Sequence, residues 1–469
     1  MDGRVCQGCR ERDALIATLQ ARIAELEQRL AALEARLGTN SSNSSLPPSA
    51  NPLGAPKPVV KKKSGRKPGG QPDHPPHLKQ LLPPERITHT RPIVPKQCEQ
   101  CHARLPAQAG PGDPEPTRFQ TIELPVLAAE VTEYQGQART CPECGHVTRA
   151  VIPEEIRAHS VEPRLSATLS YLSGCHGLSK RAVEEIAEAV FDAPIALGTV
   201  ANLEQEMSAA LESAHQEALA AVRAAAVKNA DETSWKQTAK LVWLWGAATT
   251  SVAAFLVQAG RGVVGLKNLL GASIYGILCT DRLAAYEQVL AECRQICWAH
   301  LKRDFQKLVD RRGAGVRLGR EGLLIVKRVF AAWHAFQEGK CTREQLEKRL
   351  GPVVGQMGRL LERGQSSEDK SVRRFCANLS KLEVSLWTFV VIEGVEPTNN
   401  FMERLLRRAV LWRKRSFGCW SESGCRFVER ILTVVQTRRL QGQSVLEYLH
   451  DALLAHRNLQ PCPRLVPEQ

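Results

Sequence analysis

The chain has 469 residues, a formal net charge of +14 and 24% charged residues. This length allows several domains, and the excess of Lys and Arg indicates a polyanionic partner, with nucleic acid as the first candidate. Fifteen cysteines, an odd number, are too few for a disulfide scaffold, and no signal peptide precedes them. These features exclude a disulfide-rich secreted protein and predict a cytoplasmic, nucleoid-associated protein that does not bind or cross a membrane.

Residues 1–37 are predicted to form a coiled-coil dimerisation helix. Apolar residues recur at alternating spacings of three and four, which is the seam of a heptad repeat. They are Ile16, Leu19, Ile23, Leu26, Leu30, Leu33 and Leu37. We expect a homodimer or higher oligomer through this helix; the alternative is a single amphipathic helix that packs on its own domain.

Residues 38–88 are rich in Pro, Ser and Gly and are predicted to be a disordered basic linker. Within it, the stretch from Gly65 to Gly69 resembles short arms that lie in the DNA minor groove. A solubilising run of charge is the alternative. The candidate DNA-binding residues of this linker are Lys61, Lys62, Lys63, Arg66 and Lys67.

Residues 89–158 are predicted to be a zinc-binding module. Two CxxC pairs occur there, Cys98 with Cys101 and Cys141 with Cys144. Four thiolates in two such pairs are the ligand set of a structural, tetrahedral Zn²⁺.

Residues 159–222 are predicted to be a helical, helix-turn-helix-like DNA-binding domain. Its second helix, from about Gly198, carries Asn202 but almost no basic residue, and it includes Glu204 and Glu206. An ordinary helical hairpin is therefore an alternative.

Residues 223–310 are predicted to be the first part of a mixed α/β core. Strands are expected to end at Asp231 and Asp281, with apolar runs between them, and the element order is βββαβαβ. The other predicted elements are strands at 241–248, 252–257 and 294–298 and helices at 261–270 and 282–291. This order is typical of a ribonuclease-H-like sheet, in which the first and fourth strands are parallel neighbours, and it brings Asp231 close to Asp281.

Paired aspartates at the end of a sheet have a common chemical use, which is to hold two divalent cations for phosphoryl transfer. Carboxylates suit Mg²⁺ (or Mn²⁺) better than thiolates do. Either aspartate taken alone is more often a turn or cap residue. The pair at matched places favours a metal site of Asp231 and Asp281.

Residues 311–392 are predicted to be an all-α insertion, 393–440 the final part of the core, and 441–469 a C-terminal tail. Glu403 lies one turn into a predicted basic helix, where a carboxylate suits a third metal ligand in a phosphate-binding groove. A capping box that begins near Asn400 is the alternative role of Glu403. Glu396 and Glu232 are rival third carboxylates, although Glu232 should point away from its neighbour Asp231.

Cys297 and His300 lie between the last predicted strand of the first core segment and a basic helix. They are candidate accessory residues that bind metal or position phosphate or water. A capping histidine is the alternative.

Several motifs together carry a resemblance to a known family. They are Asn40-Ser-Ser-Asn-Ser-Ser45, Gly65-Arg-Lys-Pro-Gly-Gly-Gln-Pro72, the two CxxC pairs, Asp231-Glu-Thr, Thr280-Asp-Arg-Leu-Ala-Ala-Tyr286, Trp298-Ala-His-Leu-Lys-Arg303 and Asn399-Asn-Phe-Met-Glu403-Arg. With the N-terminal coiled coil, they span nearly the whole chain, which resembles the transposases of the insertion sequence 66 family, bacterial DDE recombinases with a ribonuclease-H-like core. Thr398, where many members have Asp, departs from the usual pattern.

The resemblance implies a catalytic triad of Asp231, Asp281 and Glu403 that holds two Mg²⁺ ions and catalyses DNA strand cleavage and strand transfer of an insertion sequence. It also implies binding of terminal inverted repeats and target DNA, and accessory proteins encoded by the element. The residues expected to contact DNA phosphates are Arg404, Arg407, Arg408, Arg413 and Lys414. Alternatives are a catalytically silent, dimeric DNA-binding regulator and a nuclease that acts on RNA.

Overall fold

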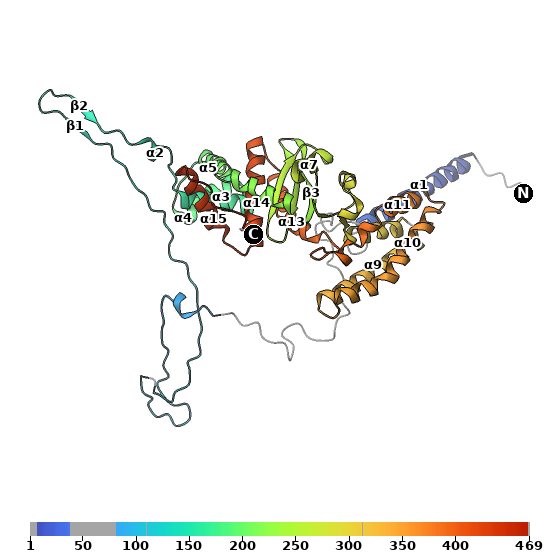
Figure 1. Ribbon diagram of the computed structural model, residues 1–469, viewed down its shortest axis with the longest axis horizontal. Helices are drawn as coiled ribbons and strands as arrows, with labels where there is room; N and C mark the ends of the chain where they lie inside the picture. The colour runs from blue at the N-terminus through green and yellow to red at the C-terminus, as the bar shows by residue number, and fades with distance from the viewer. Residues whose placement is uncertain (1–6, 38–80, 109, 312, 468–469) are drawn as a thin grey trace, which may run out of the picture. The chain divides into compact units, whose positions relative to one another are not determined.

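The structure is a computed structural model that describes residues 7–37, 81–108, 110–311 and 313–467 (Figure 1). The chain divides into two compact units, one of residues 57–128 and the other of residues 1–56 and 129–469. The larger unit contains the mixed sheet and most of the helices, and it carries the candidate site. The linker cations at positions 61, 62, 63, 66 and 67 lie outside the described residues.

Helix α1 (Gln7–Leu37) is a continuous helix of 31 residues over the segment predicted to dimerise. The seam residues whose side chains are described, from Ile16 to Leu30, are between 44% and 58% exposed. Arg22 and Arg29 both pair with Glu25 on the same helix. An apolar stripe left open to solvent is the surface that one strand of a coiled coil presents to its partner, and dimerisation itself stays a prediction.

Each CxxC pair lies in a tight turn. In the smaller unit, which also contains the turn η2 (Pro84–Arg86), a backbone bridge between Gln97 and Arg104 closes the loop around the first pair. In the larger unit, the antiparallel strands β1 (Ala138–Thr140) and β2 (Val147–Arg149) flank the second pair.

A five-stranded mixed sheet forms the centre of the larger unit (Figure 1). Its order is β5-β4-β3-β6-β7, with β3, β4 and β5 antiparallel and β3, β6 and β7 parallel. The predicted parallel pairing of the first and fourth strands is therefore confirmed. The strands are β3 (Val227–Gln237), β4 (Lys240–Ala248), β5 (Ala253–Gln258), β6 (Ile277–Thr280) and β7 (Arg294–Ile296).

The connections between the strands differ in part from the prediction. Helix α7 (Val263–Leu270) begins two residues later than expected. The helix predicted at 282–291 is wrong: two short 3₁₀ turns stand there, η3 (Ala284–Gln288) and η4 (Ala291–Cys293). Extended residues before and after η3 break the helical path, and the chain thereby returns directly to β7.

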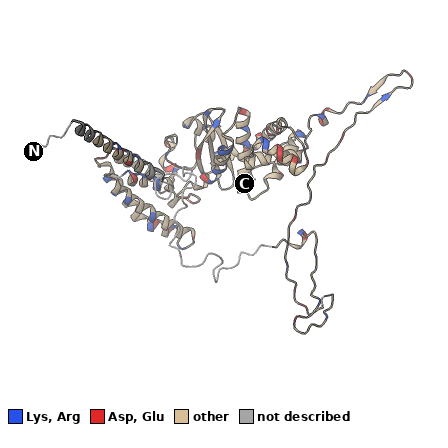
Figure 2. Ribbon diagram, turned by 180° about the vertical axis from the view of Figure 1, so that it is seen from behind, with Lys and Arg blue, Asp and Glu red and all other residues tan. Residues whose placement is uncertain are grey.

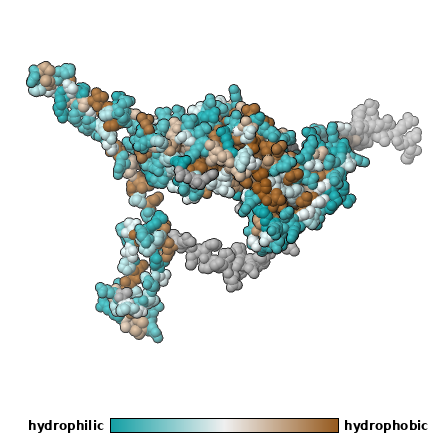
Figure 3. Space-filling view, viewed as in Figure 1, coloured by the Kyte–Doolittle hydropathy of each residue, from teal (hydrophilic) through white to brown (hydrophobic). Residues whose placement is uncertain are grey.

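Helices cover both faces of the sheet because neighbouring strand residues point to opposite sides. Leu244 on β4 packs with Met402 of helix α13 (Asn400–Ser416). Trp245 belongs to the opposite core, with helices α6 (Glu212–Ala224), α7 and α14 (Glu422–Leu440). On the face shown in Figure 3, hydrophobic residues also gather at the surface where Figure 1 labels β3.

The segment predicted as a helical domain shares the core of the sheet. It comprises α3 (Pro163–His176), α4 (Lys180–Phe191), α5 (Leu197–Ala210) and α6, and the short α2 (Glu154–Arg157) precedes it. Helix α5, the candidate recognition helix, contacts α3, α4, α14 and α15 (Val445–Arg457), and its Asn202 is exposed. Its acids are ion-paired, Glu204 with Lys180 and Glu206 with Arg457. The residues labelled a C-terminal tail thus contribute α15 to the core.

The predicted all-α insertion is helical in the structure. Its elements are α9 (Gly315–Gln337), α10 (Arg343–Gln365), α11 (Lys370–Ser380), η5 (Val384–Leu386) and α12 (Thr388–Val391). They form a hydrophobic core with α8 (Trp298–Asp310) that reaches Cys279 of β6 and Ile296 of β7. Lys and Arg recur along these helices (Figure 2). The insertion is thereby anchored to the same edge of the sheet that carries Asp281.

Candidate metal and phosphoryl-transfer site

Asp231 and Asp281 occupy equivalent positions on neighbouring parallel strands. Strand β3 pairs with β6 through Asn229 opposite Cys279, so two further residues along each strand bring the two aspartates level. Asp281 directly follows β6, as predicted. Asp231 does not end its strand, because β3 continues to Gln237 in the hairpin with β4.

The pKa of Asp231 responds to the charges of both other predicted carboxylates, Asp281 and Glu403. Its pKa is raised well above the ordinary value of 3.8, chiefly by burial and then by the negative charges of Glu232, Asp281 and Glu403. The Asp231 carboxylate accepts a hydrogen bond from the amide of Glu232, which only partly offsets this effect. The strands and the distant helix α13 therefore form one cluster of negative charge.

Helix α13 is anchored by the residue that precedes it, Asn399. Asn399 is fully buried and precedes the helix; its amide group accepts a hydrogen bond from Asn229 Nδ2 at 2.9 Å and donates one to the carbonyl oxygen of Ala230 at 2.8 Å. Its side chain makes no cap hydrogen bond, so the capping-box alternative for Glu403 is wrong. Because Asn399 binds β3 just before Asp231, it fixes where the first turn of α13 places Glu403.

Glu403 lies beside cationic and neutral donors from α8. Its Oε1 atom is 3.5 Å from His300 Nδ1 and 3.7 Å from Arg303 Nη2. Both Glu403 Oε1 and His300 Nδ1 are buried and lack a hydrogen-bond partner among the described residues. Burial lowers the pKa of His300, and the charge of Arg303 lowers it further. The imidazole is therefore biased toward its neutral form, which leaves the carboxylate oxygen available to a further ligand.

Cys297 joins His300 at this corner. Ligand atoms of Cys297, His300 and Glu403 all lie within 4.8 Å of one another, a spacing at which they are able to hold a metal ion. Burial raises the pKa of Cys297 to about 11, and its Sγ accepts a hydrogen bond from the Asn399 amide at 3.1 Å. The thiol therefore has a structural role in locking α13 to α8, and metal binding by this trio stays a prediction.

The rival carboxylates occupy other surroundings. Glu232 is buried on the other side of β3, where it pairs with Arg261 at 2.6 Å and accepts a hydrogen bond from Tyr286 at 2.9 Å. These bonds occupy both of its oxygens. Glu396 is exposed.

Arg294 is a site residue that the sequence did not reveal. It is fully buried on β7, and its Nη2 donates to the carbonyl oxygen of Asp281 at 3.2 Å, while Nε and Nη1 have no partner among the described residues. Burial lowers its pKa, and the negative charge of Asp281 opposes this effect. A charged residue inside the apolar stretch Arg-Gln-Ile-Cys-Trp was the available signal.

The candidate DNA-binding residues of α13 differ in their surroundings. Arg404, Arg407 and Lys414 are exposed. Arg408 donates to the carbonyl oxygen of Cys175 at 3.3 Å, and Arg413 hydrogen-bonds Ser234 and Thr233 of β3. Arg404, Arg407 and Lys414 are therefore accessible to a ligand. The guanidinium of Arg413, in contrast, helps to hold α13 on the sheet.

The candidate zinc ligands lie in matching turns. The His102 amide donates to the Cys98 carbonyl, and the Gly145 amide donates to the Cys141 carbonyl, which curls each chain back over its own cysteine pair. Backbone hydrogen bonds from Cys101 and Cys144, respectively, lower the pKa of Cys98 and Cys141. Each pair thus has one thiol, Cys98 or Cys141, that is biased toward the thiolate form that binds metal. A single site of four cysteines stays a prediction.

Comparison with known proteins places the chain in a family. The sequence model of the transposase IS66 family matches residues 159–426, which is more than half of the chain, and the chain therefore belongs to this family. A model of a family of unknown function (DUF6444) matches residues 4–80.

A curated relative extends the comparison. An uncharacterized protein, y4qI, from Sinorhizobium fredii (strain NBRC 101917 / NGR234) is 27% identical over 242 residues. The match covers 45% of this chain and 43% of that protein, so it spans less than half of the relative. Within the described part of the chain, no helix is long and apolar enough to span a membrane.

Proposed function

We propose that this chain is a DDE transposase that cleaves DNA strands at the ends of an insertion sequence and joins them to target DNA. The observation that carries the proposal is the parallel β3–β6 register, which brings Asp231 level with Asp281, together with the Asn399 hydrogen bond that holds the start of the Glu403 helix on β3. The strand order supports a ribonuclease-H-like core for this site. The basic charge of the chain and its family fit a DNA substrate.

The three carboxylates fit divalent cations. The charges of Asp281 and Glu403 raise the pKa of Asp231, and Glu403 Oε1 is buried without a hydrogen-bond partner among the described residues, with Arg303 3.7 Å away. Oxygen-only carboxylate ligands suit Mg²⁺ or Mn²⁺. When bound, two such ions activate the attacking oxygen and stabilise the leaving oxygen in phosphoryl transfer.

The surrounding residues hold these carboxylates in place. Arg294 binds the backbone carbonyl of Asp281 from below the site. Asn399 fixes the start of α13, and His300 and Arg303 flank the Glu403 side chain. Such outer contacts keep ligand oxygens oriented when the charges in the site change.

The remaining modules supply binding and assembly. Exposed Arg404, Arg407 and Lys414 on α13 would contact phosphates, which position DNA without reading its sequence. We assign end recognition to the two cysteine turns, whose thiols are the candidate zinc ligands, and to the α4–α5 helices. The seam of α1 pairs two subunits, which brings two ends of the element together. The protein acts on DNA of the nucleoid, and accessory proteins of the element are further partners.

Replacement of Asp281 by Asn tests this function. The variant keeps the shape of the side chain and removes its charge, so cleavage of a duplex that carries the element's terminal repeat should fall below detection while gel-shift binding of the same duplex persists. The control is Asp310→Asn on α8. A variant that loses binding and retains cleavage per bound duplex would remove Asp281 from the catalytic role.

A further inference from the structure

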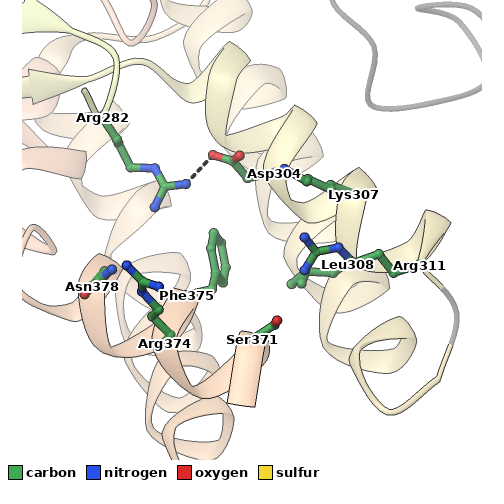
Figure 4. A pocket seen from close by; sticks show the side chains of 9 residues that line it. All are labelled: Arg282, Asp304, Lys307, Leu308, Arg311, Ser371, Arg374, Phe375 and Asn378. Carbon is green, nitrogen blue, oxygen red and sulfur yellow. Dashed lines mark hydrogen bonds and ion pairs between the residues drawn. The ribbon is translucent and has the colours of Figure 1, made fainter. Parts of the chain in front are cut away.

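A pocket of about 320 Å³ opens where the insertion meets the core (Figure 4). Its walls come from three places: Arg282 two residues after β6, Lys307 on α8 with Arg311 at the end of that helix, and Arg374 and Phe375 on α11. The sequence separates these residues widely, and the packing of α11 beside α8 brings them together. The pocket therefore exists only because the insertion is present.

The pocket has a strong excess of positive charge. Four cations line it, Arg282, Lys307, Arg311 and Arg374, against one acid, Asp304. Asp304 is ion-paired with Arg282. Lys307, Arg311 and Arg374 form no ion pair with any carboxylate that the structure describes. Because cations at one concave site repel each other, this arrangement favours binding of an anion.

Arg282 is held as a fixed wall of the pocket. Its guanidinium lies between Asp304 and the ring of Phe375, at 5.1 Å from the ring centroid. Its Nε is buried and has no hydrogen-bond partner within the described residues. The guanidinium groups of Arg282, Arg311 and Arg374 turn toward the space around Phe375 in Figure 4. A fixed guanidinium with an unused donor suits a phosphate oxygen, and Arg recognises phosphate with several N–H groups at once.

The pocket begins one residue from the carboxylate cluster. Arg282 follows Asp281, and adjacent Cα atoms are about 3.8 Å apart. A strand whose reacting phosphate lies at Asp281 therefore carries neighbouring phosphates past Arg282. A free anion does not need this proximity, whereas a polyanionic strand benefits from it.

We propose that this pocket binds a backbone phosphate of the DNA strand beside the cleavage position, and that the insertion thereby clamps the substrate. This inference rests on the proposed function for the identity of the strand. It gives α11 a substrate-binding role, with Arg374 as its principal contact. Phosphate contacts of this kind position DNA and carry no base specificity.

The salt dependence of DNA binding tests the pocket without any catalytic step. A fluorescent duplex that carries the element's terminal repeat is titrated in EDTA at several chloride concentrations. The slope of log affinity against log salt should fall in magnitude by about 1 for Arg374→Ala, and Arg311→Ala combined with Arg374→Ala should add little to this, because both residues meet the same phosphate. Arg359→Ala, at an exposed position of α10 outside the pocket, should leave the slope unchanged.

A second measurement covers variants that fold poorly. A photo-reactive amino acid at Asn378, which lines the pocket, should cross-link to the duplex in otherwise wild-type protein, and one at Arg359 should not. Equal salt slopes for Arg374→Ala and Arg359→Ala, together with no cross-link at Asn378, would overturn the inference.

Other outcomes separate the possible ligands and the two proposals. If inorganic phosphate binds the wild type and not Arg374→Ala while the DNA slopes agree, the pocket holds a free anion and the DNA clamp is wrong. If the slopes change as expected but the wild type never cleaves, the clamp stands and the proposed catalytic function fails. If cleavage depends on Asp281 and the slopes do not change, the proposed catalytic function stands and the DNA clamp is wrong.

Discussion

At the scale of single residues, the carboxylates around Asp231 repel one another. The pKa of Asp231 is raised by burial and by three neighbouring carboxylates, and one of these, Glu232, is itself bonded to Arg261 and Tyr286. A native pKa above the unfolded value means that the folded state binds the proton more tightly. The stability that this proton contributes is complete near and below pH 3.8 and is lost as the pH rises through the native pKa.

Replacement of Asp231 by Asn should therefore stabilise the metal-free protein at neutral pH. The amide oxygen still accepts the hydrogen bond from the Glu232 amide, and the repulsion disappears. In EDTA, the melting temperature of the variant should exceed that of the wild type by about 2–4 °C per kcal/mol of relieved repulsion. The difference should shrink as the pH falls toward 4, which calorimetry across a pH series measures.

Added Mg²⁺ provides the control for this prediction. At a Mg²⁺ concentration one hundred times the dissociation constant, binding should stabilise the wild type by about 2.7 kcal/mol and raise its melting temperature accordingly. The melting temperature of Asp231→Asn should rise much less. An Asn variant that is less stable than the wild type at neutral pH in EDTA would contradict the electrostatic account.

The residue scale was predictable where strand geometry decides. Alternation along β3 separates Asp231 from Glu232, and the parallel pairing with β6 aligns Asp231 with Asp281. The sequence did not reveal that Arg294 supports Asp281 or that Asn399 holds α13 on β3. Both donate to backbone carbonyls that only the folded chain brings near them.

At the scale of elements, the joint between α13 and β3 decides where Glu403 lies. Asn399 makes this joint through buried hydrogen bonds to Asn229 and Ala230. The loop after α13 adds a second joint, since the Cys419 amide donates to the Lys236 carbonyl at 2.8 Å. Gly418 allows this approach, because its φ is +112° and a Cβ there would lie 2.2 Å from the same carbonyl oxygen.

Loss of the first joint should impair both stability and cleavage. Asn399→Ala removes a hydrogen bond from the buried Ala230 carbonyl and another from the half-buried Asn229 amide, and should lower the free energy of unfolding by about 2–3 kcal/mol. Misplacement of Glu403 should reduce the rate of cleavage about 10–100-fold at a temperature where the variant is folded. Urea unfolding and single-turnover cleavage measure the two effects.

The neighbouring residue offers a matched control. Asn400 begins α13 and is exposed, so Asn400→Ala should change the free energy of unfolding by no more than about 0.5 kcal/mol and leave cleavage intact. Equal behaviour of the two variants would show that the Asn399 joint does not position Glu403.

Element types followed from the sequence better than element limits. Apolar runs predicted β4, β5 and β6 because their buried residues are contiguous. The strand to Asp231 was expected to stop there, and it continues because the hairpin with β4 extends its pairing beyond the polar residues. Local composition does not encode such a tertiary extension.

At the scale of the whole molecule, the chain combines a shared core with an unpartnered seam. Helices α3, α5, α6 and α15 contribute buried residues to the core of the sheet, although the sequence marks them as a separate domain and a tail, while α4 packs with α3 and α5 in a smaller cluster of its own. The sequence shows the apolar positions of these helices, but it does not show that they cover the sheet. The seam of α1, in contrast, is exposed in the single chain.

The exposed seam of α1 indicates an oligomer, which substitutions at seam positions should dissociate. Leu19→Lys combined with Leu26→Lys places charge at two seam positions and should convert a dimer or larger assembly to monomer in light scattering. Ala21→Lys combined with Gln28→Lys adds the same charge on the opposite side of the helix and should leave the mass unchanged. A wild type that is already monomeric at micromolar concentration would contradict the pairing.

The central claim is that Asp231, Asp281 and Glu403 together catalyse DNA cleavage. The most direct measurement is Mg²⁺-dependent cleavage of a labelled duplex that carries the element's terminal repeat, by the wild type and by Glu403→Gln. We predict cleavage by the wild type, loss of cleavage in the variant, and gel-shift binding by both. Cleavage by both proteins would move the third ligand away from Glu403, and tight binding without cleavage by either would contradict the catalytic account in favour of a DNA-binding regulator.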